Sequence, residues 1–315
     1  MNFLLIVGGL ILLILGGNWL LKSAVALSLK LNISKVVIGM TVVSFATSAP
    51  ELIVSINAAL NGSSDLALGN VIGSNVANLA FVLGITLILG SMNVQKSFYK
   101  TDWPVMMIAS GLLFFFLAND NVIELFEGVF LFGIFLFAFL IGFLIYLLRS
   151  QNNLDVDEIL EDEVLLPTYK IFFYLIIGGL GLYGGSELLI KGATSLAIQF
   201  GVTERVIGVT VVSIGTSVPE LAASIIAIIK KEKAISLGNL IGSNIFNILA
   251  VIGITSIITP ITLSDERLLT SDIYWMLGIS FILLPMVFIP KKYNLNWKHG
   301  IVLLLGYCTF IYMTL

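Results

Sequence analysis

Two glutamates follow prolines inside apolar segments of the sequence, FATSAPELI at residues 45–53 and IGTSVPELA at residues 214–222. A proline in a spanning helix removes one backbone hydrogen bond and frees a carbonyl one turn earlier. Each segment therefore offers carbonyl, hydroxyl and carboxylate oxygens close together. These hard ligands suit sodium and calcium rather than soft transition metals. We predict a cation-binding site that contains Glu51 and Glu220.

A second motif supplies further oxygen ligands in both halves of the chain. Ser74 and Asn78 are four residues apart, so they lie on one face of a helix. Ser243 and Asn247 have the same spacing. The glycine before each serine leaves room for helices to approach closely. A cation between these groups would offset the cost of placing carboxylates in a membrane, which is at least about 2.5–3.5 kcal/mol each.

Both motifs also have structural interpretations. A Pro–Glu pair can mark a kink whose glutamate reaches outward, and a GSN segment can be a simple helix-packing motif. The kink would have to occur twice at matching depth, so we favour a binding site. Thr47 and Ser48 precede the predicted helix break, and we expect them to cap the half-helix that begins at the proline.

The composition is that of a membrane protein, because 58% of the 315 residues are hydrophobic, only 11% are charged, and the mean hydropathy is +1.06. We predict an all-α polytopic membrane protein with helices of about 20 apolar residues. The first apolar run lacks the flanks of a signal peptide, so we interpret it as a retained helix. Ten transmembrane helices are predicted, at residues 3–29, 36–60, 67–90, 103–118, 123–148, 171–198, 206–229, 235–259, 270–289 and 297–314.

Charge and composition argue against several other classes. The net charge of −3 gives no nucleic-acid footprint. Cys308 is the only cysteine and His299 the only histidine, so neither an intrachain disulfide nor a Cys/His metal centre is expected. We interpret His299 as a solvated residue at the membrane interface. The expected partners are inorganic cations and the lipid bilayer, with no cofactor and no obligate protein partner evident.

The sequence repeats itself after 169 residues. Residues 39–52, GMTVVSFATSAPEL, align with residues 208–221, GVTVVSIGTSVPEL. With the same shift and no gap, residues 68–86 align with residues 237–255. Such an ungapped match indicates an internal duplication.

Each half contributes five predicted helices, and an odd number makes the second half enter the membrane in the opposite sense. This inverted-topology repeat is typical of secondary transporters. We predict a first five-helix repeat at residues 1–149, a second at residues 170–315, and an acidic cytoplasmic linker at residues 150–169.

The basic residues predict the orientation of the chain. If the N-terminus lies outside, the C-terminus also lies outside, and the only basic residues in the outside loops are Arg205 and Arg267. The positive-inside rule supports this arrangement. The inside loops then contain Lys30, Lys35, Lys96, Lys100, Arg149, Lys170, Lys230, Lys231, Lys233, Lys291, Lys292 and Lys298.

Two other charged groups have simple interpretations. The linker carries six acidic residues between Asp155 and Glu163, but it lacks the glycine and the ligand spacing of an EF-hand loop. A solvated linker is therefore favoured over a calcium sensor. Glu187 and Lys191 are four residues apart in the sixth predicted helix, and we interpret them as a structural or interfacial ion pair.

The motifs TSAPEL, TSVPEL, GSNVAN and GSNIFN resemble the paired α-repeats of the calcium/cation antiporter superfamily, specifically its sodium/calcium exchangers. The first α-repeat would span residues 39–86 and the second residues 208–255. The resemblance extends over most of the chain. It implies secondary active exchange of Na⁺ for Ca²⁺ by alternating access, in which the first and sixth helices slide past a fixed core.

The resemblance also implies roles for individual residues. Glu51 and Glu220 would be shared by calcium and sodium, and the backbone carbonyls of Thr47 and Thr216 would complete the calcium shell. The sodium sites would use, besides both glutamates, Ser44, Thr47, Ser48 and Ser243 on one side and Ser74, Ser213, Thr216 and Ser217 on the other.

Asn78 and Asn247 would line the centre of this site. Several relatives carry aspartate at the position of Asn247, so this chain has only two central carboxylates. The difference implies potassium-independent transport with weaker proton competition. If three sodium ions exchange for one calcium ion, one net charge crosses per cycle and transport is electrogenic.

Two alternative functions stay open. One is a proton-coupled antiporter of calcium or another divalent cation on the same fold, and the other is a passive cation channel. An enzyme is not expected, because the sequence has no nucleophile–base pair and no HExxH motif. We expect a multi-pass protein of a prokaryotic plasma (inner) membrane.

Overall fold

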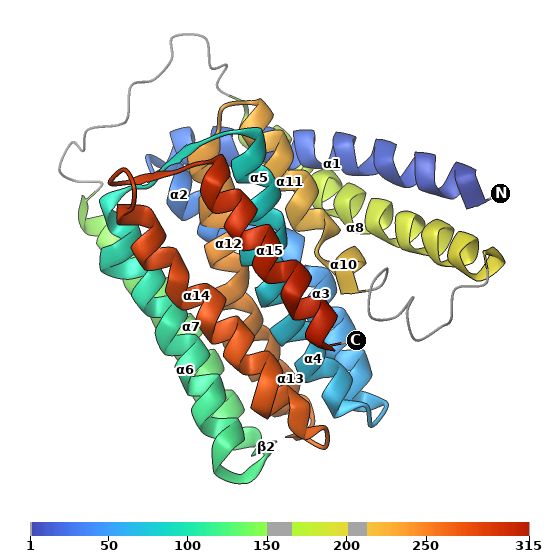
Figure 1. The fold of residues 1–315 in the computed structure, drawn as a ribbon. Coiled ribbons are helices and arrows are strands. Elements are labelled where there is room, and N and C mark those ends of the chain that lie inside the picture. Colours follow the sequence, from blue (N-terminus) through green and yellow to red (C-terminus); the bar gives the residue numbers. More distant parts are fainter. Residues whose placement is uncertain (1, 150–165, 201–212, 315) are drawn as a thin grey trace.

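Helices make up almost all of the structure, a computed structural model that describes residues 2–149, 166–200 and 213–314 (Figure 1). Every predicted span is mostly helical over its described part, so the all-α prediction is confirmed. Residues 206–212, Arg205 and linker residues 150–165 lie outside the described residues. The first repeat comprises α1 (Asn2–Leu31), α2 (Lys35–Ile38), η1 (Gly39–Val43), α3 (Ser44–Leu60), α4 (Ser64–Val76), η2 (Ala77–Val82), α5 (Leu83–Leu89), η3 (Phe98–Asp102), α6 (Trp103–Asp120) and α7 (Leu125–Arg149).

The second repeat has the same order of elements, and the η elements in both repeats are π-helical turns within longer helices. It comprises α8 (Thr168–Gln199), α10 (Ser213–Thr216), α11 (Val218–Ile229), α12 (Lys233–Phe246), η5 (Asn247–Ile252), α13 (Gly253–Ile258), η6 (Leu268–Asp272), α14 (Ile273–Phe288) and α15 (Trp297–Thr314).

The second motif of each repeat forms the centre of the bundle. In the described residues, seven helices are long and apolar enough to cross a bilayer, and two of them are far more buried than the rest. These are residues 64–89 and 233–258, in which 78% and 83% of the apolar window is buried. One hydrophobic cluster joins them across the repeat boundary, so the two repeats share one core.

Short strands connect loops of the two repeats. β1 (Met92–Asn93) pairs with β4 (Asn294–Leu295), and β2 (Val122–Ile123) pairs with β3 (Ile261–Thr262), both antiparallel. The predicted topology assigns β1 and β4 to one side of the membrane and β2 and β3 to the other. Each pair therefore joins loops of the same predicted side.

Polar contacts between the loops follow the same grouping. Lys35 Nζ lies 3.0 Å from Glu232 Oε1, and Lys233 Nζ donates to the Ser91 carbonyl at 2.6 Å. All of these residues belong to the side of β1 and β4. On the opposite side, the Ser264 N–H donates to Asp65 Oδ1 at 2.8 Å. The inverted topology predicted from the repeat is therefore confirmed.

The helices α1 and α8 pack along each other and contact α11, and one end of the pair extends away from the other helices (Figure 1). Glycines let the two backbones approach each other. A Cβ atom on Gly16 would lie 2.7 Å from the Leu182 nitrogen, and one on Gly185 would lie 2.9 Å from the Gly9 carbonyl oxygen. Backbone atoms cannot move aside as a flexible side chain can, so this interface requires glycine.

The predicted helix break occurs in one repeat only. In the second repeat a helix ends at Thr216, and α11 begins with Pro219 in its first turn. In the first repeat α3 continues through Pro50, so the prediction that Thr47 and Ser48 cap a new half-helix was wrong. Proline removes only one N–H group, and the buried face of α3 holds the turns on both sides of it in a helix.

His299 is buried rather than solvated, so this prediction was also wrong. Its exposed fraction is 7%. The ring Nδ1 accepts a hydrogen bond from the Asn296 N–H at 3.0 Å, and Nε2 lies 2.6 Å from the Ile289 carbonyl oxygen. These two backbone partners compensate for the burial of the ring, so the residue has a structural role at the start of α15.

The α1–α8 interface predicts a sharp difference between two neighbouring glycines. Gly185→Ala should lower the melting temperature of the purified protein, because overpacking against backbone atoms typically costs about 1–3 kcal/mol. Gly184→Ala is the matched control, because a Cβ atom there meets nothing within 4 Å. It should leave the melting temperature unchanged or raise it slightly. Equal melting temperatures for the two variants would contradict the close packing.

Candidate cation-binding site

Hydroxyl groups hold one of the two glutamates in place. Glu220 is 0% exposed, and its Oε1 accepts hydrogen bonds from Ser48 Oγ at 2.7 Å and from Ser243 Oγ at 3.5 Å. Ser48 lies on α3, about one turn before Glu51. The helices of the two glutamates, α3 and α11, therefore pack against each other across the repeat boundary.

The remaining acceptors of the site are unpaired in the described part of the chain. Neither carboxylate oxygen of Glu51 has a hydrogen-bond partner there, and the same is true of Glu220 Oε2 and the amide oxygens of Asn78 and Asn247. All four side chains are 0% exposed. Buried acceptors are normally satisfied, and a buried charge without a partner is strongly unfavourable. A cation is the partner that such a set of oxygens can bind.

The repeat brings the helices that carry these oxygens together in pairs. Asn78 lies on η2, which packs against α11, the helix of Glu220. Asn247 lies on η5, which packs against α3, the helix of Glu51. Each repeat therefore contributes one carboxylate and one amide, and each amide approaches the carboxylate-bearing helix of the other repeat. A cation between them would contact both repeats.

Of the predicted hydroxyls of the first repeat, Ser48 binds Glu220, and the others have different surroundings. Ser44 Oγ donates to the Met40 carbonyl of its own helix at 2.6 Å. Thr47 Oγ1 contacts Asn239 Oδ1 in the other repeat at 3.2 Å. Ser74 is buried, with 2% of its surface exposed. The oxygen of each of these hydroxyls also has lone pairs that can coordinate a cation.

The predicted hydroxyls of the second repeat lie at the break between α10 and α11. Thr216 and Ser217 are 9% and 1% exposed. Ser217 Oγ has no hydrogen-bond partner within the described ranges, although Ser48, its counterpart in the first repeat, binds Glu220. Ser213 is the first residue of α10, and its side chain lies outside the described structure.

Two residues that contact the backbone of the candidate site, Ser186 and Asn70, were not predicted from the sequence. Ser186 on α8 donates to the Gly215 carbonyl at 2.7 Å, which is the carbonyl that Pro219 cannot satisfy. Its counterpart in the first repeat is Gly17, so the repeat gives no signal for it. Asn70 in turn contacts the Glu51 carbonyl at 3.3 Å and Ser55 Oγ at 3.0 Å. The match of Asn70 to Asn239 in the aligned motifs is the signal that could have revealed these asparagines.

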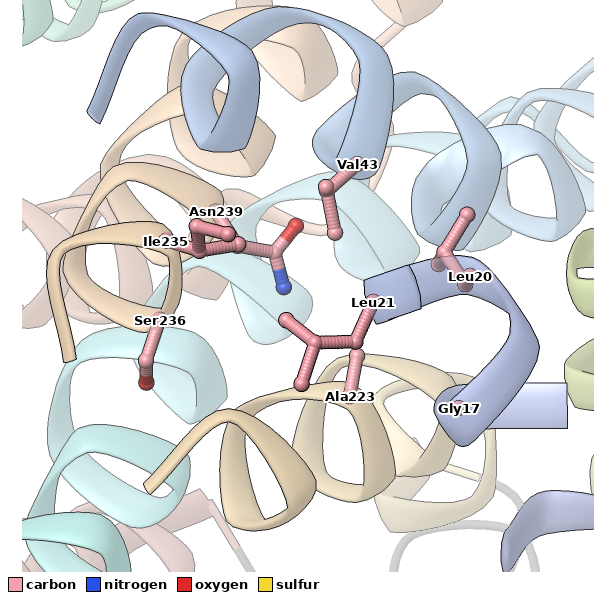
Figure 2. Close-up of a pocket in the computed structure, with 8 residues that line it drawn as sticks. All are labelled: Gly17, Leu20, Leu21, Val43, Ala223, Ile235, Ser236 and Asn239. Atoms are coloured by element: carbon pink, nitrogen blue, oxygen red, sulfur yellow. The ribbon is translucent and has the colours of Figure 1, made fainter. Parts of the chain in front are cut away.

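A small cavity of about 10 Å³ lies beside the site, between α1, η1, α11 and α12. Figure 2 shows Leu21, Val43 and the Asn239 amide pointing toward one another. Among the described residues, Asn239 Nδ2 and the nearby Ser236 Oγ have no hydrogen-bond partner. The space is at the lower limit for one water molecule. The cavity is lined by Gly17, Leu20, Leu21, Val43, Ala223, Ile235, Ser236 and Asn239.

Comparison with known proteins places the chain in a family. The sodium/calcium exchanger protein family matches residues 1–144 and 170–315. The chain belongs to this family. It is 36% identical to the putative antiporter CaxA of Alkalimonas amylolytica, over 97% of this chain and 96% of CaxA. It is 33% identical to the inner membrane protein YrbG of Escherichia coli (strain K12), over 88% of this chain and 86% of YrbG.

A solved structure supports the same conclusion for the fold. The sodium-calcium exchanger NCX_Mj has a TM-score of 0.78 and 28% identity, and the match covers 100% of this chain and 99% of NCX_Mj. The chain is thus an integral multi-pass membrane protein of a transporter family, a cation/calcium antiporter and not an enzyme.

The geometry predicts that both glutamates are required for cation binding. Glu51→Gln and Glu220→Gln each remove one of the two central charges, and each should abolish calcium binding measured by titration calorimetry. Glu187→Gln is the control, since Glu187 and Lys191 form the predicted ion pair, at 3.6 Å between Oε2 and Nζ, with both side chains exposed. Wild-type calcium affinity in either central variant would refute the site.

Proposed function

We propose that the chain exchanges sodium for calcium across the membrane by alternating access. The observation that supports this most strongly is the cluster of buried carboxylate and amide oxygens that have no donors in the described residues. Calcium takes 6–8 oxygen ligands, including carboxylates and carbonyls, and sodium is a hard cation with the same preference. Since both ions would use the same two carboxylates, the binding of one would displace the other, which is the requirement for exchange.

Charge balance favours this pair of ions. The carboxylates of Glu51 and Glu220 together balance one calcium ion or two sodium ions. The neutral ligands around them, Asn78 and Asn247, add coordination without adding charge. Potassium-independent transport follows from the absence of a third carboxylate at residue 247. Net charge would cross the membrane if three sodium ions exchanged for one calcium ion, at about 2.3 kcal/mol per charge and 100 mV.

The proposed ligands follow from the two motifs. Calcium would be bound by Glu51, Glu220 and the backbone carbonyls of Thr47 and Thr216. Asn78 and Asn247 would line the centre. The flanking sodium ions would use the glutamates together with the hydroxyls of Ser44, Thr47, Ser48, Ser74, Ser213, Thr216, Ser217 and Ser243.

The α1–α8 pair would provide the conformational step. Close packing at its glycines would let the pair move as one unit past α11, while the candidate site would stay in the remaining bundle. We place both termini outside, the acidic linker in the cytoplasm and the protein in a prokaryotic plasma membrane. The name of YrbG, an inner membrane protein, supports this location.

Radiolabelled calcium uptake tests the proposed function directly. Purified protein is reconstituted into liposomes loaded with sodium and diluted into sodium-free buffer, with the pH clamped equal on both sides. Uptake should be saturable and should require internal sodium, because only an outward sodium gradient drives calcium inward. Liposomes loaded with potassium or choline are the control and should show no uptake.

Other outcomes would replace this proposal. Uptake that ignores sodium but follows an imposed pH gradient would show proton-coupled antiport on the same fold. Uptake that requires no counter-ion and does not saturate would show a channel.

The neutral amide at the centre predicts the response to acid. Asn247→Asp adds a third buried carboxylate beside Glu51 and Glu220, and a group that must bind protons competes with cations at low pH. Transport by this variant should therefore decline at a higher pH than transport by the wild type. The measurement is the pH profile of sodium-dependent calcium uptake, and unchanged profiles would contradict a central position of residue 247.

A further inference from the structure

Four buried asparagines form a hydrogen-bonded network across the repeat boundary, in the order Asn247, Asn75, Asn244 and Asn78. Asn247 Nδ2 donates to Asn75 Oδ1 at 3.2 Å, and Asn78 Nδ2 donates to Asn244 Oδ1 at 3.3 Å. Asn75 Nδ2 donates to the Asn244 carbonyl at 3.4 Å, and Asn244 Nδ2 donates to the Asn75 carbonyl at 3.3 Å. All four side chains are at most 1% exposed.

The pairing is crossed between the repeats. Asn75 and Asn78 lie one helical turn apart in the first repeat, but Asn75 contacts the side chain of Asn247 in the second. Asn244 contacts the side chain of Asn78 in the same way. The backbone carbonyls of Asn75 and Asn244 lie just before the π-helical turns η2 and η5, where the regular helical hydrogen-bond pattern is interrupted.

The backbone carbonyls determine which way every amide points. A carbonyl only accepts hydrogen bonds, so the atom of Asn75 that contacts the Asn244 carbonyl must be its nitrogen. The oxygen of Asn75 then faces Asn247, and only the nitrogen of Asn247 can donate to it. The oxygen of Asn247 is left without a partner among the described residues.

The same argument applies to Asn244 and Asn78 in the other half of the network. The Asn75 carbonyl fixes the nitrogen of Asn244, the oxygen of Asn244 fixes the nitrogen of Asn78, and the oxygen of Asn78 is left unpaired within the described structure. The amide nitrogens of Asn75 and Asn244 also contact the sulfurs of Met276 and Met106, which are weak acceptors. Both free oxygens thus belong to the helices that pack against Glu51 and Glu220.

We propose that Asn75 and Asn244 are positioning residues that turn the amide oxygens of Asn247 and Asn78 toward the bound cation. The inference rests on the proposed function, because it assigns the orientation of two ligands in that site. An asparagine amide without this constraint can rotate and present its N–H groups, which repel a cation. The network excludes that orientation, because the side-chain nitrogens of Asn247 and Asn78 already donate to Asn75 and Asn244.

A crossed double-mutant cycle tests this role. Calcium affinity is measured by titration calorimetry on purified wild type and on variants in sodium-free buffer. Asn75→Ala should weaken calcium binding about 10–100-fold, the range found when partners that orient metal ligands are removed. In an Asn247→Ala background the same change should weaken it no more than about 2-fold, because no amide is left to orient.

The pair within one repeat is the internal control. Asn75→Ala and Asn78→Ala should have effects that multiply, since a different asparagine orients Asn78. The mirror cycle should couple Asn244 with Asn78 but not with Asn247. Asn61→Ala at the exposed end of α3 should bind calcium like the wild type. Melting curves identify variants that do not fold, and Asn75→Leu and Asn244→Leu, which fill the space with an apolar group, then replace the alanine variants.

The cycle separates this inference from the proposed function. Coupling in the crossed pairs only would support the positioning role. Coupling of Asn75 with Asn78, multiplying effects in the crossed pairs, or wild-type affinity in Asn75→Ala would overturn it while leaving sodium/calcium exchange intact. A wild-type protein that binds neither calcium nor sodium would overturn both.

Discussion

The burial of two carboxylates at the centre of an apolar bundle is the constraint on which the rest of the structure depends. Glu51 and Glu220 are 0% exposed, and their helices pack against each other. Desolvation and mutual repulsion both oppose this arrangement, and a cation offsets both terms. The surrounding side chains follow from it: hydroxyls and amides, whose oxygens can face a cation, occupy positions that an ordinary helix bundle fills with apolar groups.

The two repeats share their motifs but have different local conformations. Glu220 accepts a hydrogen bond from Ser48, whereas the equivalent Ser217 is unpaired within the described residues, as are the carboxylate oxygens of Glu51. The helix of the first motif continues through Pro50, and that of the second is interrupted before Pro219. An inverted repeat with identical halves would present the same access to both sides of the membrane. A difference between the repeats is therefore what the proposed alternating access would require.

Most of the fold could be predicted because hydropathy and the internal repeat are both visible in the sequence itself. Spans of apolar residues gave the helices, and the shift of 169 residues gave the inverted topology. Features that depend on three-dimensional context were missed. His299 is buried because backbone groups of Asn296 and Ile289 satisfy its ring, and Pro50 is tolerated because packing holds α3 together. Neither fact has a signal in the local sequence.

The candidate site shows the same limit more finely. The repeated motifs predict the charged and hydroxyl groups as candidate ligands. They do not predict the direction of an amide, because nitrogen and oxygen occupy the two ends of the same group. Here backbone carbonyls at the α-to-π transitions fix the direction of each amide in the network of Asn75, Asn78, Asn244 and Asn247. The network also suits the proposed binding of a divalent cation by two carboxylates. Two fixed amide dipoles would add ligands without adding charge, so the ligand charge would match that of calcium.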